Sequence, residues 1–202
     1  MATKLPTVAI IGRANAGKSS LFNRMMRSQQ AIVAREAGTT RDRVVGKAAY
    51  HGHEFWLVDT AGLKPAEDEF EASIQEQITD ASDAADVILV VVDSTEYPSD
   101  EDRRVAKTAL KSRKPVILIA NKTDLRGSLP TSEFLRLGIK SIIRTSAEHN
   151  SGISDALDEI CQHIPEKRQA EPSDVLKIAL IGRPNVGKSS LFNTLAGKQQ
   201  AI

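Results

Sequence analysis

Short apolar runs alternate with longer amphipathic stretches along most of the chain. The apolar runs predict strands at Thr7–Ile11, Val44–Tyr50, Glu54–Val58, Val87–Val92, Val116–Ala120 and Ser141–Ile143. The amphipathic stretches predict helices at Gly17–Met26, Glu69–Ala81, Glu101–Ser112, Ser132–Leu137 and Ile153–His163. The uninterrupted runs VILVVV and VILIA are typical of central strands buried on both faces of a sheet.

The connections between these elements predict how the strands pair. Only His51-Gly52-His53 separates the second and third strands, which favours a tight hairpin and an antiparallel pair. The other strands alternate with helices, and such strand–helix–strand units favour parallel pairing. We therefore expect an α/β fold with a mostly parallel six-stranded sheet that is flanked by helices on both faces.

An internal repeat indicates the domain organisation. Residues 8–32 align without gaps on residues 178–202, and sixteen of the twenty-five positions are identical. Residues 165–174 are rich in proline and charge, which predicts an exposed linker. We expect a first domain at 1–164 and the truncated start of a second, similar domain at 175–202. The chain is interpreted as the amino-terminal fragment of a two-domain protein; a natural protein that kept only the start of the repeat is the alternative.

Composition excludes several classes of protein. Hydrophobic residues make up 41% and charged residues 26%, which is ordinary for a globular chain. The 27 basic and 26 acidic side chains leave a net charge of +1, so we expect neither DNA nor a membrane as a partner. No apolar run approaches the roughly 20 residues of a membrane span. A lone cysteine, Cys161, cannot form an internal disulfide, and a cytoplasmic location is expected.

The segment GRANAGKS matches the G-x-x-x-x-G-K-[ST] pattern of a phosphate-binding loop, between a predicted strand and a predicted helix. Its backbone N–H groups would face phosphate oxygens, Lys18 would neutralise the β- and γ-phosphates, and the Ser19 hydroxyl would bind Mg²⁺. The predicted binding residues are Gly12, Arg13, Ala14, Asn15, Ala16, Gly17, Lys18 and Ser19. The second copy, GRPNVGKS, supplies Gly182, Asn185, Gly187, Lys188 and Ser189.

The segment DTAG directly follows the third predicted strand, Glu54–Val58. A carboxylate at the carboxyl end of a strand lies beside the phosphate loop in such sheets, where Asp59 could hold Mg²⁺ through water. The Gly62 N–H could approach the γ-phosphate. The predicted binding residues here are Asp59, Thr60, Ala61, Gly62 and Leu63.

Two further segments predict a base pocket. NKTD follows the strand Val116–Ala120, and its Asp124 carboxylate could accept hydrogen bonds from the guanine N1–H and N2–H₂ groups, a donor pair that adenine lacks. SAE follows the last strand, where a backbone N–H could meet the guanine O6. The predicted base-site residues are Asn121, Lys122, Asp124, Ser146 and Ala147.

These motifs, in this order, resemble those of the translation-factor-related (TRAFAC) P-loop GTPases. The doubled phosphate loop is similar to that of the tandem-G-domain Der (EngA) family of ribosome-assembly GTPases. The resemblance implies a Ras-like fold, GTP hydrolysis with Mg²⁺, and a role in assembly of the large ribosomal subunit, with ribosomal contacts mainly beyond residue 202. It also implies a switch threonine, Thr40, that joins Ser19 and Asp59 at Mg²⁺, with Thr39 as the competing candidate. The sequence departs from the pattern at Ala14, Ala16 and Ala37.

The sequence leaves more than one mechanism of GTP hydrolysis open. Leu63 stands where Ras-like enzymes place a water-positioning glutamine, so other groups must hold the water. The expected catalytic residues are Lys18, Thr40, Gly62 and Asn15. Asn15 would either coordinate K⁺, as in some relatives, or only stabilise the loop. A binding scaffold with negligible hydrolysis is the alternative function, and a single-G-domain GTPase of tRNA modification is disfavoured by the second phosphate loop.

Overall fold

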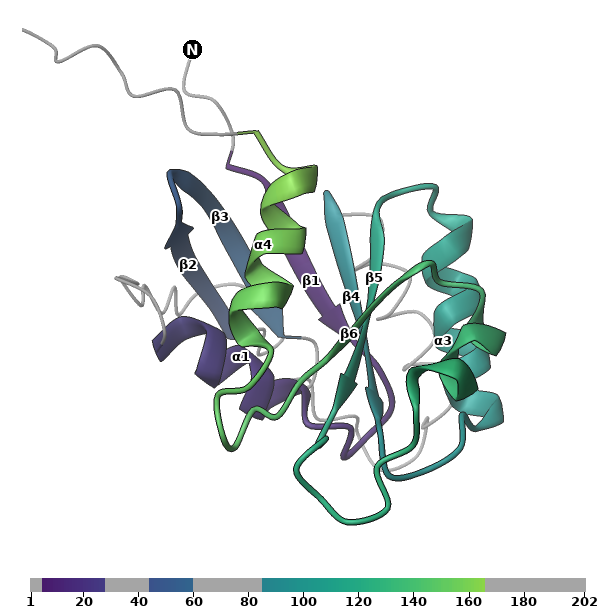
Figure 1. Cartoon of the computed structure of the whole chain (residues 1–202). Coiled ribbons are helices and arrows are strands. Elements are labelled where there is room, and N and C mark those ends of the chain that lie inside the picture. The colour runs from purple at the N-terminus through teal and green to yellow at the C-terminus, as the bar shows by residue number, and fades with distance from the viewer. Residues whose placement is uncertain (1–4, 28–43, 60–84, 166–202) are drawn as a thin grey trace, which may run out of the picture. The chain divides into compact units, whose positions relative to one another are not determined.

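The computed structural model describes residues 5–27, 44–59 and 85–165, which include a six-stranded sheet in the order β2-β3-β1-β4-β5-β6 (Figure 1). The strands are β1 (Thr7–Ile11), β2 (Val44–Tyr50), β3 (His53–Asp59), β4 (Val87–Asp93), β5 (Val116–Asn121) and β6 (Ser141–Arg144). The α-helices of these ranges are α1 (Lys18–Arg27), α3 (Asp100–Lys111) and α4 (Ile153–His163). The β2–β3 pair is antiparallel and the other neighbours are parallel, so the predicted sheet is confirmed.

Both faces of the sheet are buried. Along β1, Val8 and Ile10 pack with α1 and α4, while Ala9 and Ile11 pack with α3 on the opposite face. Strand β4 is buried at every position, as its uninterrupted apolar run predicts. The parallel strands are therefore covered on both sides, with two separate apolar clusters above and below the sheet.

The hairpin between β2 and β3 is tighter than the sequence predicted. Its turn contains two residues, His51 and Gly52, with φ of +44° and +84°, and Tyr50 pairs directly with His53. Positive φ at both central positions is the mark of a type I′ turn, whose twist matches that of the flanking strands. The prediction of a three-residue turn was wrong because His53, although polar, is buried as the first residue of β3.

The predicted helix Ser132–Leu137 is a 3-10 helix, η2 (Thr131–Leu137). It begins after Pro130 and ends at Gly138, which has φ of +78°. Phe134 and Leu137, three residues apart, are both buried in the core. A helix with three residues per turn places such a pair on one side, so core packing favours the tighter helix over this short stretch.

Several predictions fall on other parts of the chain. The predicted helix Glu69–Ala81 and the whole repeat at 175–202 lie outside the described residues. The chain divides into two compact units, Met1–Lys167 and Arg168–Ile202, and the predicted domain boundaries stay a prediction. Within the described ranges, no helix is both long and apolar enough to cross a membrane.

Parallel pairing brings the carboxyl ends of five strands to one edge of the sheet. These strands end at Ile11, Asp59, Asp93, Asn121 and Arg144. In open α/β sheets this edge is where ligands bind, because the loops that follow the strands meet there. Those residues predicted to bind phosphate and base that fall within the described ranges lie at this edge.

Candidate functional site

The loop from Gly12 to Ser19 connects β1 to α1 and passes very close to its neighbours. A Cβ on Gly12 would lie 2.3 Å from the carbonyl oxygen of Val91, and one on Gly17 would lie 2.3 Å from Asn121 Nδ2. Both glycines also have positive φ, which side-chain-bearing residues rarely adopt. The loop conformation therefore requires glycine at both positions.

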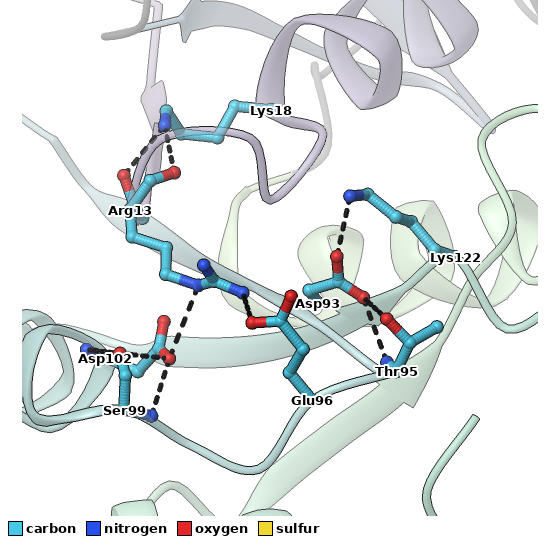
Figure 2. Close-up of polar contacts among 9 residues, drawn as sticks. Arg13, Lys18, Asp93, Thr95, Glu96, Ser99, Asp102 and Lys122 are labelled. Carbon is cyan, nitrogen blue, oxygen red and sulfur yellow. Dashed lines mark hydrogen bonds and ion pairs between the residues drawn. The ribbon is translucent and has the colours of Figure 1, made fainter. Parts of the chain in front are cut away.

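Lys18 closes this loop with its side chain. Its Nζ donates to the carbonyl oxygens of Gly12 at 2.8 Å and Arg13 at 2.7 Å (Figure 2). The residue is only 8% exposed. Burial lowers the pKa of the Lys18 ammonium, and the negative charge of Asp59 opposes that shift. A buried cation at the start of α1, where the first N–H groups of a helix lack intrahelical partners, favours an anionic ligand.

The Arg13 side chain turns away from Lys18 and toward α3 (Figure 2). Its Nη2 donates to Glu96 Oε2 at 2.6 Å, and its Nε lies 3.6 Å from Asp102 Oδ2. Asp102 also accepts hydrogen bonds from the backbone N–H and hydroxyl of Ser99, in a capping box that begins α3. Arg13 thus links the phosphate loop to the start of α3.

Asn121, the last residue of β5, connects three segments of the site. Its Nδ2 donates to the Ala16 carbonyl oxygen at 3.2 Å. Its Oδ1 accepts from Thr145 Oγ1 at 3.1 Å and from the Ala147 N–H at 3.2 Å. The side chain is buried, at 2% exposure of the residue, so these bonds are shielded from water. One amide therefore fixes the phosphate loop against the segment that follows β6.

Lys122 follows with φ of +68° and pairs with the last residue of β4. Its Nζ donates to Asp93 Oδ2 at 2.6 Å (Figure 2). Burial would raise the pKa of Asp93, but the hydrogen bonds from Lys122 and Thr95 hold that pKa below its ordinary value. The pair is therefore ionised, and it holds the carboxyl ends of β4 and β5 together.

The predicted base-site residues lie on the loops after β5 and β6. A hydrogen bond with the Ser146 side chain lowers the pKa of Asp124, so its carboxylate is kept ionised as an acceptor. Arg24 of α1 donates to the carbonyl oxygens of Ala147 at 2.6 Å and Glu148 at 2.7 Å. These bonds position the Ser146–Ala147 segment from the side of the phosphate loop.

The oxygen donors of the described residues fit Mg²⁺ bound together with a nucleotide. Ser19 is exposed at the start of α1, and Asp59 ends β3 with 2% exposure. Within the described ranges, no three His, Cys, Asp or Glu side chains form a metal cluster. A hydroxyl and one carboxylate suit a magnesium ion that completes its shell with water and phosphate oxygens.

The structure therefore brings together the phosphate loop, Asp59 and the segments that carry Asn121, Asp124 and Ala147. Other predicted site residues lie outside the described ranges. They are Thr40, Thr60, Ala61, Gly62, Leu63, Gly182, Asn185, Gly187, Lys188 and Ser189.

Sequence reasoning missed Arg24, Asp93 and Asp102, which support the site without belonging to a recognised motif. The pattern Ser99-x-x-Asp102 is a local capping signal that could have indicated the role of Asp102 at α3. Arg24 bonds to a residue 123 positions away, and no local pattern encodes that pairing.

Residues 7–122 and 177–202 match a protein family described as "50S ribosome-binding GTPase". The chain belongs to this family. Members of the family contain a GTPase domain, and the Ras-like P-loop fold predicted for this chain agrees with its sheet order and with the solved structures it resembles.

Among curated proteins, the chain is 44% identical over 201 residues to "GTPase Der" of Gemmatimonas aurantiaca. The alignment covers 98% of this chain and 45% of that relative, so the chain spans less than half the relative's length. The predicted resemblance to the Der family is thereby confirmed.

Two Era structures are similar in fold. An Aquifex aeolicus Era variant bound to GDP and AlF4⁻ has a TM-score of 0.62 and 27% identity, covering 88% of this chain and 63% of Era. Era in complex with MgGDPNP and nucleotides 1506–1542 of 16S ribosomal RNA has a TM-score of 0.62 and 28% identity, covering 85% of this chain and 61% of Era.

Proposed function

We propose that this chain binds guanine nucleotides with Mg²⁺ and hydrolyses GTP to GDP and phosphate. We also propose that the protein acts as a switch in assembly of the large ribosomal subunit. The observation that carries the proposal is the Asn121 side chain, which bonds to Ala16 in the phosphate loop and to Ala147 beside the base site. A single side-chain amide that holds the phosphate loop and the base-site segment together suits a ligand that has phosphates at one end and a base at the other.

Guanine selectivity is assigned to Asp124. Its carboxylate is an acceptor for the guanine N1–H and N2–H₂ groups, and a backbone N–H of the segment after β6 is the donor for O6. The Asp124 carboxyl is ionised at neutral pH, and only the ionised carboxylate accepts both hydrogen bonds. Adenine would present no matching donor pair and would leave the acceptor without partners.

Phosphate binding is assigned to the loop N–H groups and to Lys18. The Lys18 ammonium is already held beside the loop by the Gly12 and Arg13 carbonyl oxygens, so little side-chain freedom remains to be lost on binding. Magnesium would offset charge on the phosphate oxygens. Ser19 and Asp59 are proposed to hold it, with Thr40 as a third ligand and the Gly62 N–H at the γ-phosphate.

For hydrolysis we propose that Asn15 takes part in coordinating K⁺. Asn15 is exposed within the phosphate loop, and its φ of +61° is a conformation that asparagine tolerates better than most residues. Turnover should be faster in potassium than in sodium buffer for the parent, and the difference should disappear in Asn15→Ala. Equal parental rates in the two buffers would leave Asn15 with a loop-stabilising role alone.

Phosphate release under multiple turnover tests the enzymatic proposal. We expect release from GTP and none above background from ATP, with loss of activity in Lys18→Ala. Tight GDP binding without phosphate release would instead identify a guanine-nucleotide-binding scaffold.

The ribosomal role rests on the family description and on the Der relative. Depletion of the protein in its own cells should cause large-subunit precursors to accumulate in sucrose gradients. A normal subunit profile after depletion would contradict this part of the proposal.

A further inference from the structure

A groove between α3 and η2 is lined by four cations and no carboxylate. Its volume is about 460 Å³. The lining residues are Arg103, Lys107, Leu110, Lys111, Arg136 and Leu137. None of them belongs to the phosphate loop or to the predicted base site, so the proposed nucleotide-binding function does not account for the groove.

The cations of α3 are arranged in a line. Arg103, Lys107 and Lys111 lie four residues apart, so they follow one side of the helix at intervals of about 6 Å. Residues 103–114 contain six Lys or Arg and no Asp or Glu, whereas the first turn of α3 is acidic. The net charge of +1 for the whole chain averages the acidic first turn of α3 with the basic segment that follows it, so it does not reveal the basic segment.

These cations are available to a ligand. Lys107, Lys111 and Arg136 are exposed and form no ion pair with any other residue in the described ranges. Arg103 is partly neutralised by Asp100, at 2.7 Å. Like charges one helical turn apart repel each other, and a polyanion in the groove would relieve that repulsion.

We propose that this groove binds the phosphate backbone of RNA. A regular line of cations, faced by Arg136 from η2, suits a chain of regularly spaced phosphates. No aromatic side chain lines the groove, so it offers no stacking platform for bases, and recognition is of the backbone and not of sequence. RNA bound in this groove would add a direct contact to the proposed ribosomal role, and its binding would depend on the groove and not on the nucleotide site.

RNA is favoured over an acidic protein by the chemistry of the lining. Two of the four cations are lysines, and lysine is depleted in protein–protein interfaces, whereas nucleic-acid interfaces are strongly basic. Leu137 is 5% exposed because it belongs to the core, and only Leu110 offers apolar surface. A protein partner would therefore gain little apolar burial here.

Fluorescence anisotropy with a labelled oligouridylate of about 20 nucleotides tests the proposal on the 202-residue chain. The triple variant Lys107→Gln, Lys111→Gln, Arg136→Gln should bind at least about tenfold more weakly at low salt. Because each phosphate contact in single strands contributes about 0.7 to the salt slope, the loss of three should lower that slope by about 2.

The matched control removes three positive charges that do not line the groove: Arg27→Gln, Arg104→Gln and Arg113→Gln. It should weaken RNA binding clearly less than the groove variant, because these side chains do not line the groove. Equal weakening in both triple variants, no RNA binding by the parent, or equally tight binding of an oligoglutamate in the groove would overturn the proposal. GDP calorimetry on the two triple variants separates loss of the RNA site from loss of the nucleotide site. Both triple variants should keep the GDP affinity of the parent.

Discussion

The Nδ2 of Asn121 donates to the carbonyl oxygen of Ala16 at 3.2 Å, although 105 residues separate the two in the chain. The bond joins the end of β5 to the middle of the phosphate loop. It also explains why Gly17 has no side chain, since a Cβ there would lie 2.3 Å from the same nitrogen. The Asn121 side chain therefore joins the phosphate loop to the end of β5, and its bonds to Thr145 and Ala147 join it to the segment after β6.

Asn121→Ala should weaken both stability and GDP binding. The change leaves the Ala16 carbonyl, the Thr145 hydroxyl and the Ala147 N–H without the partner they have now. Buried groups left unpaired cost about 1–3 kcal/mol each, so urea titration should show a loss of at least about 2 kcal/mol. Asn23→Ala, at an exposed position of α1, is the control and should behave like the parent. Parental GDP affinity in Asn121→Ala would contradict the assigned role.

Asp124→Asn should exchange base selectivity. The amide presents a donor where the carboxylate accepted, so GDP should bind at least about a hundredfold more weakly and xanthosine diphosphate more tightly. Asp155→Asn, at an exposed position in the first turn of α4, is the control. Calorimetry with both nucleotides measures the effect, and unchanged GDP affinity would remove Asp124 from the base site.

Gly17→Ala and Gly127→Ala separate backbone strain from steric clash. The two glycines have nearly the same φ, +92° and +89°, so both variants should bear a similar strain of about 1–2 kcal/mol. Only the Gly17 variant also places a Cβ against Asn121, whereas Gly127 has nothing within 4 Å. Gly17→Ala should therefore unfold at clearly lower urea concentration and lose GDP binding. Equal destabilisation of the two variants would show that the clash contributes nothing.

Lys122→Met should change how stability depends on pH. The pKa of Asp93 is held below its ordinary 3.8, so in the parent this group contributes stability that is present above that value and lost as pH falls through the folded pKa. Without Lys122, the Asp93 pKa should rise, because burial is then opposed only by the hydrogen bonds from Thr95. The stability gap between parent and variant should be largest near about pH 7 and should narrow toward about pH 3.

Urea unfolding across this pH range measures the gap. Lys47→Met is the control. Lys47 and Glu54 form a partly exposed ion pair, with 3.0 Å between Lys47 Nζ and Glu54 Oε2. Such a pair contributes about 1 kcal/mol or less. A gap for Lys122→Met that does not depend on pH would contradict the account of Asp93.

The sequence predicted those parts of the molecule that local patterns encode. The run VILVVV corresponds to β4, which is fully buried, and the phosphate-loop pattern identified Lys18 between β1 and α1. Both signals lie within a few neighbouring residues. The 3-10 geometry of η2 was not predictable in this way, because it depends on the core that receives Phe134 and Leu137.

Long-range polar contacts were also beyond sequence patterns. Arg24 and Ala147 lie 123 residues apart, and an arginine on an amphipathic helix is ordinarily a solvated side chain. Asp93 is the last residue of its strand, as Asp59 is, yet no motif indicates that Asp93 pairs with Lys122. The cations of the α3–η2 groove were hidden by a near-zero net charge.

GDP calorimetry on the parent, Lys18→Ala and Lys188→Ala tests the central claim most directly. The 202 residues contain two phosphate loops but only one NKTD segment, so we predict a stoichiometry near one for the parent. Binding should be lost in Lys18→Ala, with urea titration confirming that this variant folds, and it should be retained in Lys188→Ala. Retained binding in folded Lys18→Ala, or lost binding in Lys188→Ala, would contradict a guanine-nucleotide site built on the first phosphate loop.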